Sequence, residues 1–445
     1  MFNRLARLRR RKLKGGLAIG SLIIDGKTTK QLFYLPHNRR VEHIVIIGKT
    51  GSGKSFLIKF IGWADVPTER GLIIADFHGD LIPFFLAGIA EEEHRTGRDL
   101  ASRVVVIRPG DPNWAVGINV LSASGQHEAF VQAAAITAIL KERWGMEHFG
   151  PRTEELLRNS LLALMANGLT LLELSPLLSD DAFRAQCLRN VANPDVREYF
   201  ESRFEPLSDA MKAVMRDPIL NKTSEFTSDP SFKFILGQQS TFSFDDVLST
   251  GKIVLIDLNK GRLGKHASTL GSLIFALIKA AVFRRSSRKV FTIFADEVHN
   301  LLTADTDFDT YFAEFRKFAV SVCIATQTLE SLPKRLQAAA MAIGTHIFFQ
   351  LSPTDAQQVS AMLDGGKPLQ ELLKNLPKRQ LIIKSGHYKW QRVQVPEVKS
   401  PTAQYADLLQ RSQNIYARRR EMIEAEILNR RPAPSAGREA LHEWE

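Results

Sequence analysis

Short apolar runs rich in valine and isoleucine alternate with longer stretches of helical periodicity over much of the chain. Runs of this length, bounded by turn-forming residues, are typical of buried strands. Strands that alternate with helices predict a parallel sheet built from right-handed crossovers, and therefore an α/β fold. The expected strands are residues 17–24, 31–35, 43–47, 72–75, 104–107, 253–257, 290–295, 320–325, 343–351, 381–383 and 393–395. The expected helices beside them are residues 56–64, 270–283, 308–318 and 353–363.

The middle of the chain has a different pattern. Between about residues 125 and 237 strand signals are scarce, and helical periodicity dominates at 129–143, 153–167 and 180–190. We therefore expect an all-helical insertion in the α/β core. The expected domains are a basic arm (1–16), the first part of the core (17–124), the insertion (125–240), the second part of the core (241–398) and a charged C-terminal helix and tail (399–445).

Composition narrows the class of protein. Of the 445 residues, 24% are charged and 44% hydrophobic, which excludes wholesale disorder, collagen and a coiled-coil rod. Two cysteines are too few for a disulfide framework or a four-cysteine zinc site, and they indicate a reducing, cytosol-facing compartment. The most apolar stretch, residues 270–283, is shorter than the roughly 20 residues that span a bilayer and contains Lys279. It is predicted as a buried core helix of a cytoplasmic protein, with peripheral attachment to the inner membrane as an option.

The positive charge is concentrated at the start of the chain. The chain carries 59 basic and 48 acidic residues, a formal charge of +11. Residues 1–14 contain seven basic and no acidic side chains, and without these seven the balance is 52 to 48. The arm is typical of a contact with a polyanion, either nucleic acid or an anionic membrane surface. A solvated tail is the alternative that composition leaves open.

The most specific motif is G-K-T-G-S-G-K-S at residues 48–55, which fits G-x-x-x-x-G-K-[ST] between an expected strand and an expected helix. Its glycines allow backbone N–H groups to surround phosphate oxygens, and the helix that follows adds its positive end. Lys54 is predicted to reach the β- and γ-phosphates, and Ser55 to bind Mg²⁺. The predicted nucleotide-binding residues are Gly48, Thr50, Gly51, Ser52, Gly53, Lys54, Ser55 and Phe56.

Two adjacent carboxylates follow the strand at 290–295. In open α/β sheets ligands bind at the carboxyl ends of the strands, where Asp296 and Glu297 are expected. Asp296 is predicted to hold Mg²⁺ through its water shell, and Glu297 to activate the attacking water as a general base. Small-molecule kinases need no hydrolytic base, because their acceptor must exclude water. The Asp-Glu pair therefore favours an ATP hydrolase over a kinase.

Two further polar residues have a candidate role in catalysis. Gln327 ends the next strand, where it could sense the γ-phosphate; the alternative is a simple strand-end cap. Arg316 lies on the helix before that strand and could reach the γ-phosphate of a neighbouring subunit in a ring. Its alternative is a solvated surface charge.

Two loops contain motifs that indicate a function less specifically. Residues 76–80 (D-F-H-G-D) follow a strand and are interpreted as a positioning turn, with a metal site formed by His78 and two aspartates as the lesser alternative. Residues 259–266 form a basic, glycine-rich loop that could contact DNA phosphates or a neighbouring subunit, or be an ordinary loop.

With these residues in view, the chain resembles the FtsK/HerA superfamily of hexameric DNA-pumping ATPases over residues 38–395, and most of all the coupling-protein ATPases of conjugation and type IV secretion. The motifs that carry the resemblance are His43 before the phosphate loop, D-x-H-G-D-L at 76–81, D-L-x-x-G-R-L-G at 257–264, Asp296-Glu297, A-E-x-R-K at 313–317, G-T-x-x-x-F from 344 with Gln350, and Asp355-Ala356.

The resemblance implies a RecA-like P-loop NTPase core with an all-helical insertion, assembled as a homo-hexamer around a pore. It implies ATP hydrolysis with Mg²⁺ at subunit interfaces, DNA as the track, and Lys54, Ser55, Asp296, Glu297, Gln327 and Arg316 as site residues. Further expected partners are a secretion-channel component and a relaxase-like substrate protein.

One departure affects the biological setting. Coupling proteins of conjugation begin with membrane-spanning helices, whereas this chain begins with a basic arm and short strands. Either a separate membrane protein recruits it, or it is a soluble relative that serves DNA repair or packaging. Two rivals from other classes stay open: a nucleotide-gated protein that recruits substrates to a secretion channel, and a membrane-surface scaffold that uses the arm.

Overall fold

The computed structural model describes residues 16–123, 125–143, 145, 150–301 and 308–430, which fold into two compact units. The first contains the chain up to Ile107 together with Ser243–Ile415, and the second contains Arg108–Phe242 and the chain from Tyr416. The predicted basic arm and the tail from residue 431 lie outside the described residues, apart from Gly16.

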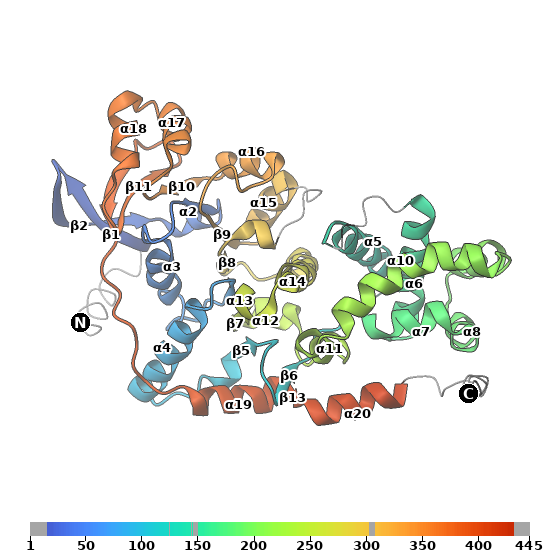
Figure 1. Ribbon diagram of the computed structural model, residues 1–445. Helices are drawn as coiled ribbons and strands as arrows, with labels where there is room; N and C mark the ends of the chain where they lie inside the picture. Colours follow the sequence, from blue (N-terminus) through green and yellow to red (C-terminus); the bar gives the residue numbers. More distant parts are fainter. Residues whose placement is uncertain (1–15, 124, 144, 146–149, 302–307, 431–445) are drawn as a thin grey trace, which may run out of the picture. The chain divides into compact units, whose positions relative to one another are not determined.

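The first unit is built on an 11-stranded sheet with the order β2-β1-β12-β11-β10-β3-β9-β8-β4-β7-β5 (Figure 1). The seven strands from β10 to β5 are parallel to their neighbours, and β10, β11, β12, β1 and β2 continue the sheet as an antiparallel extension. The predicted α/β fold with a mainly parallel sheet is confirmed. The strands are β1 (Leu17–Ile24), β2 (Lys27–Leu35), β3 (Ile44–Ile47), β4 (Leu72–Asp76), β5 (Val104–Ile107), β7 (Ile253–Asp257), β8 (Phe291–Ala295), β9 (Val320–Thr326), β10 (Thr345–Phe348), β11 (Gln380–Ser385) and β12 (Gln391–Gln394).

The central strands were predicted well from the sequence pattern because they are buried along their whole length. Every residue of β3, β4, β5, β7 and β8 is buried, because helices cover both faces of a parallel sheet. Such strands read as continuous apolar runs. The helices of this unit are α2 (His37–Arg40), α3 (Lys54–Trp63), α4 (Leu81–Thr96), α12 (Phe244–Thr250), α13 (Lys260–Leu263), α14 (His266–Arg284), α15 (Phe308–Lys317), α16 (Lys334–Ala342), α17 (Pro353–Met362), α18 (Gly366–Lys374) and α19 (Ala406–Tyr416), with 3₁₀ turns η1 (Ala101–Arg103) and η4 (Val298–Asn300).

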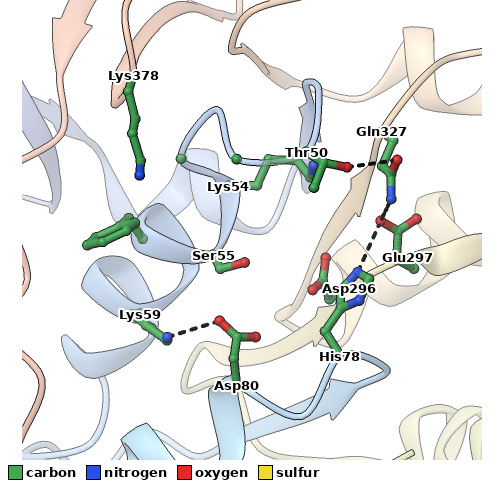
Figure 2. Close-up of a pocket in the computed structure, with 13 residues that line it drawn as sticks. Thr50, Lys54, Ser55, Lys59, His78, Asp80, Asp296, Glu297, Gln327 and Lys378 are labelled. Carbon is green, nitrogen blue, oxygen red and sulfur yellow. Dashed lines mark hydrogen bonds and ion pairs between the residues drawn. The ribbon is translucent and has the colours of Figure 1, made fainter. Parts of the chain in front are cut away.

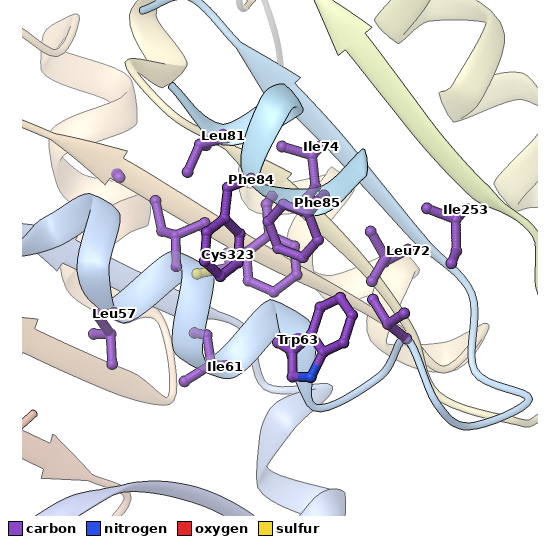
Figure 3. Close-up of a cluster of buried hydrophobic side chains, with 14 of the residues drawn as sticks. Leu57, Ile61, Trp63, Leu72, Ile74, Leu81, Phe84, Phe85, Ile253 and Cys323 are labelled. Atoms are coloured by element: carbon purple, nitrogen blue, oxygen red, sulfur yellow. The ribbon is translucent and has the colours of Figure 1, made fainter. Parts of the chain in front are cut away.

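The main core lies between α3, α4 and one face of the sheet (Figure 3). Alternate residues of β9 show the two faces: Cys323 belongs to this core, whereas Val322 and Ile324 lie against α14 and α15. Close helix packing requires small residues here, since a Cβ on Gly88 would come within 2.6 Å of the Trp63 ring. Two layers of helices thus hold the sheet rigidly, which fixes the loops at its carboxyl edge.

Within the described residues, α14 is the one helix long and apolar enough to cross a membrane by length and composition alone. About 61% of its most apolar stretch is buried inside the unit. Such burial is expected of a core helix, and the sequence pattern predicts a core helix at this position.

The second unit is helical in its described part except for one pair of short strands. β6 (Trp114–Val116) pairs with β13 (Ala417–Arg419) in antiparallel register. Side-chain caps start several helices; Ser208, for example, accepts from the Met211 N–H. The helical elements are α5 (Gln126–Arg143), α6 (Pro151–Ala166), η2 (Leu171–Glu173), α7 (Leu174–Ser179), α8 (Asp181–Arg189), α9 (Pro194–Glu198), the π-helical η3 (Tyr199–Phe204), α10 (Asp209–Thr227), α11 (Pro230–Leu236) and α20 (Arg420–Arg430).

The C-terminal segment differs from its prediction. The sequence pattern predicted one charged helix within residues 399–445, but the chain forms α19, then β13, then α20. The break is stabilised by the ladder to β6 and by Arg419, whose guanidinium lies 4.4 Å from the centre of the Trp114 ring. The predicted single helix is therefore wrong. The second unit also begins before residue 125 and includes this segment, which local periodicity had assigned to a separate tail.

Candidate active site

The phosphate-loop motif lies between β3 and α3 at the carboxyl edge of the sheet. Gly53 precedes the helix with φ of 127°, a conformation that side chains other than glycine rarely adopt. A Cβ on Gly48 would come within 2.6 Å of the Phe349 Cβ on the neighbouring strand end. The glycine positions are thus imposed by backbone geometry and packing, as the motif requires.

Lys54 begins α3 and is 8% exposed. Its Nζ donates to the Gly48 carbonyl at 2.6 Å, so the amine points back into the loop. Burial lowers the pKa of Lys54, and the carboxylates of Glu297 and Asp296 partly oppose that effect. The buried amine therefore faces both the concave backbone and the acidic side of the site.

A pocket of about 290 Å³ opens in front of this loop (Figure 2). Residues from five separate segments of the first unit converge on it. The lining residues are Thr50, Gly51, Gly53, Lys54, Ser55, Phe56, Lys59, His78, Asp80, Asp296, Glu297, Gln327 and Lys378. Of the predicted nucleotide-binding residues, Gly48 and Ser52 do not line it. Ser52 instead shapes the loop, because its hydroxyl donates to the Lys49 carbonyl at 2.7 Å.

The two predicted carboxylates follow β8 directly. Asp296 is 1% exposed, and its Oδ2 has no hydrogen-bond partner among the described residues. Burial raises the pKa of Asp296 to about 6; His78 acts against this rise, and Glu297 and Asp76 add to it. Glu297 is 4% exposed and has φ of 51°, a strained conformation for a residue with a side chain. Strain of this kind is found where a side chain must be aimed at a site.

Gln327 connects the phosphate loop to Glu297. Its Nε2 donates to Glu297 Oε1 at 3.0 Å, and its Oε1 accepts from the Thr50 hydroxyl at 3.1 Å (Figure 2). The sequence placed Gln327 at a strand end beside the nucleotide, and the structure brings it into the pocket. A group that enters between Thr50 and Glu297 must therefore disturb this bridge.

The 76–80 loop forms a tight turn. The buried Asp76 carboxylate accepts backbone N–H bonds from His78, Gly79, Leu81 and Ile82 at 2.8–3.1 Å. His78 Nε2 then lies 3.4 Å from Glu297 Oε1. The prediction of a positioning turn describes this geometry. The alternative of a metal site formed by His78 with two aspartates is wrong about the other ligands. The ligand atoms that lie together, within 4.8 Å of one another, belong to His78, Asp296 and Glu297.

Two lining residues, Lys59 and Lys378, had no sequence signal. Lys59 of α3 pairs with Asp80 of the 76–80 loop at 3.0 Å. Lys378 comes from the loop after α18, and the next residue holds this loop against the phosphate loop, since the Arg379 N–H donates to the Ser52 carbonyl at 2.9 Å. These residues join the site only through tertiary contacts.

Arg316 is not part of the lining of this pocket. It lies on α15 with its side chain 60% exposed, and its Nη2 is 3.5 Å from Glu42 Oε1. The helix is anchored by the buried His43, whose Nε2 donates to the Phe312 carbonyl at 2.6 Å while its Nδ1 accepts from the Val322 N–H at 3.0 Å. Burial lowers the pKa of His43 to about 4, so the ring stays neutral and keeps both bonds.

The donor set suits a small hard cation. Mg²⁺ prefers oxygen ligands, and the pocket lining offers the Ser55 hydroxyl and the Asp296 Oδ2, which has no partner among the described residues. A buried carboxylate oxygen without a partner costs free energy unless a cation or its water shell satisfies it. The residues present therefore fit a magnesium ion bound together with phosphate groups.

Comparisons with known proteins agree with this geometry. The family model described as "Helicase HerA, central domain" matches residues 17–274, which is more than half of the chain. No curated protein matches. Among solved structures, the plasmid coupling protein TrwB with a non-hydrolysable ATP analogue is 15% identical, covers 88% of this chain and 97% of its own, and has a TM-score of 0.62.

Two further structures extend the comparison. TrwB with ADP and Mg²⁺ is 15% identical over 87% of this chain and 96% of its own, with a TM-score of 0.60. VirB4 of Thermoanaerobacter pseudethanolicus is 12% identical over 86% of this chain and 97% of its own, with a TM-score of 0.61. At such identities the likeness is one of fold, that of RecA-like P-loop ATPases. The match of the family model shows that this chain belongs to the family of the HerA helicase central domain, and is an FtsK/HerA-type P-loop ATPase.

Proposed function

We propose that this chain is an ATP- and Mg²⁺-dependent motor that moves DNA and hydrolyses ATP at the interfaces of a ring of like subunits. The observation that carries the proposal is the bridge from Thr50 through Gln327 to Glu297, because it connects the phosphate loop to the candidate base. A motor needs such a link, so that hydrolysis changes the position of parts of the chain. The experiment that tests it is ATP turnover with and without DNA.

Binding of the nucleotide is assigned to the phosphate loop and Lys54. The concave backbone at residues 48–53 would receive phosphate oxygens, and the Lys54 amine would leave the Gly48 carbonyl for them. Ser55 and Asp296 would hold Mg²⁺, which neutralises developing charge on the phosphate oxygens when it is bound. TrwB, a relative in fold, has been crystallised with an ATP analogue and with ADP and Mg²⁺.

Activation of water is assigned to Glu297. Its carboxylate is buried and accepts the Gln327 amide on Oε1 at 3.0 Å, and its Oε2, which lies 3.5 Å from His299 Nδ1, is the oxygen assigned to the water molecule. It can then take a proton from that water as the water approaches the γ-phosphate. Gln327 would release Thr50 when a γ-phosphate is present, so occupancy of the pocket would be reported to the strand that carries the glutamine.

Stabilisation of the transferred phosphoryl group is assigned to Arg316 of an adjacent subunit. The residue is exposed, lies outside the pocket of its own chain, and sits on a helix fixed by His43. An arginine supplied in trans raises turnover by about 10³–10⁵-fold where it operates. This assignment makes the ring a requirement for hydrolysis.

Mixed assemblies test that requirement. Arg316→Ala and Lys54→Ala proteins are each expected to be inactive, whereas mixtures of the two should regain part of the ATP turnover, because one interface type then combines an intact pocket with an intact arginine. The measurement is steady-state ATPase against mixing ratio. Lys317→Ala, which removes a neighbouring exposed charge, serves as the matched control. Absence of recovery at every ratio, with subunit exchange verified, would contradict action in trans.

The proposed setting is DNA transfer by conjugation or type IV secretion, on the cytoplasmic side of the inner membrane. It is supported by the fold of the conjugative coupling protein TrwB and of VirB4. A separate membrane protein or channel component and a relaxase-like substrate protein are the proposed partners. Contacts to DNA would be mostly to phosphates, and binding would therefore weaken steeply with salt.

A further inference from the structure

The loop after β7, residues 259–265, packs against His78 and Asn300, both of which contact the candidate base Glu297. It contains α13 and presents three basic residues, Lys260, Arg262 and Lys265, all exposed. Gly264 has φ of 59° and open space where a Cβ would be, so the loop projects from the surface. Arg262 pairs with Asp257, which is 6% exposed. Among the residues that the structure describes, the exposed side chains of this loop include the basic Arg262 and Lys265.

One set of contacts joins this loop to the turn that carries His78. The Asn259 Nδ2 donates to the His78 carbonyl at 3.0 Å, and the Lys260 N–H donates to the Phe77 carbonyl at 3.2 Å. A Cβ on Gly79 would lie 2.3 Å from Asn259 Nδ2, which shows how closely the two loops pack. His78 Nε2 lies 3.4 Å from Glu297 Oε1. A movement of the loop is therefore passed to the Glu297 carboxylate through Asn259 and His78.

A second set of contacts reaches Glu297 from its other side. The Lys260 amine donates to Asn300 Oδ1 at 2.6 Å. Asn300 is 5% exposed and its N–H donates to the Glu297 carbonyl at 2.9 Å, closing the turn that holds the strained glutamate. The amine of Lys260 thus points inward to the catalytic turn, while Arg262 and Lys265 belong to the outer face.

We propose that residues 259–265 form a contact for the phosphate backbone of DNA, and that occupancy of this contact sets the position of Glu297 through the Asn259–His78 and Lys260–Asn300 hydrogen bonds. The inference rests on the proposed function and states how binding of DNA would regulate ATP hydrolysis. DNA phosphates are favoured as the partner by the charge of the outer face. Arg262 would exchange the Asp257 carboxylate for a phosphate, which pulls the loop and, with it, Lys260.

The outer face is tested by Arg262→Ala/Lys265→Ala. A fluorescent duplex oligonucleotide should bind about tenfold more weakly, and the slope of log affinity against log salt should become shallower by about 0.9 per lost phosphate contact. The matched control is Arg288→Ala/Lys289→Ala, two exposed basic residues just before β8, at the opposite edge of the sheet. Affinity and slope equal to wild type would overturn the DNA contact. A changed oligomeric state in sedimentation, with DNA binding intact, would assign the loop to a subunit interface and overturn it as well.

The inner connection is tested by Lys260→Met, with Lys260→Arg as the conservative rescue. Lys260→Met should bind the oligonucleotide within about twofold of wild type, yet the ratio of ATP turnover with saturating DNA to turnover without it should fall to near one. Lys260→Arg keeps a donor for Asn300 and should restore much of the ratio. A wild-type ratio in Lys260→Met would overturn the coupling. Thermal unfolding of each variant checks that the fold is retained.

The outcomes separate this inference from the proposed function. Wild-type protein without any DNA stimulation contradicts the proposed function, and the inference falls with it. Normal stimulation of the wild type, with variants that behave the same, contradicts the inference alone.

Discussion

Lys54→Ala protein is expected to lose ATP turnover by about 10²-fold or more, the scale seen when one preorganised charged or hydrogen-bonding group is removed from a transferring centre. Among the described residues that line the pocket, Lys54 is the one whose amine donates to the backbone of the phosphate loop, at the Gly48 carbonyl. Without it the phosphate loop loses its own positive charge, and less of the charge that develops at the β- and γ-oxygens is neutralised. The measurement is steady-state ATPase with nucleotide binding followed in parallel.

The fold should survive this change. Among the described residues the Lys54 amine bonds to backbone carbonyls and forms no ion pair, so its removal breaks no direct pair with a carboxylate. Lys289→Ala, an exposed lysine before β8, is the control for loss of a positive charge far from the pocket. Hydrolysis at close to the wild-type rate by Lys54→Ala protein would remove the phosphate loop as the site of chemistry.

Glu297→Gln is the second change with a large expected effect. Glutamine preserves the size of the side chain and its hydrogen-bonding contact with Gln327, but it cannot take a proton from water. ATP should still bind with an affinity near that of wild type, while turnover should fall by about 10²–10⁴-fold, the usual contribution of a general base. Single-turnover hydrolysis measured beside nucleotide binding separates the two effects.

The control for this change is Glu314→Gln, which removes a half-buried carboxylate from α15 that pairs with Lys317. It should hydrolyse ATP at the rate of wild type. Rapid single-turnover hydrolysis by Glu297→Gln protein would exclude Glu297 as the base. Loss of ATP binding together with turnover would instead mean that the glutamate holds the pocket together.

The elements that could be predicted from sequence are those whose signal is local. The buried parallel strands read as apolar runs because both of their faces are covered, and the phosphate loop is one contiguous segment. Asp296, Glu297 and Gln327 were found because parallel strands end at the same edge, so residues that follow different strands meet there. Their hydrogen-bonded order, with Gln327 between Thr50 and Glu297, needed the three-dimensional structure.

The residues that were missed depend on contacts between distant segments. Lys378 reaches the pocket only because the Arg379 N–H binds the Ser52 carbonyl, more than three hundred residues away in the chain. The break between α19 and α20 has a similar origin: β13 exists through its ladder with β6, and a three-residue strand leaves no periodicity to detect. His78 was noticed as a possible metal ligand, but its partners Asp296 and Glu297 follow a different strand from the aspartates nearby in sequence.

The most direct measurement is steady-state ATPase of the purified full chain at low salt, without DNA and with single-stranded or duplex DNA. A DNA-moving motor predicts a several-fold rise in turnover with one of the two, because the track is then coupled to the hydrolytic site, and the better strand type identifies the track. Tight ATP binding with turnover that neither form of DNA changes would contradict the motor and favour a nucleotide-gated recruitment protein.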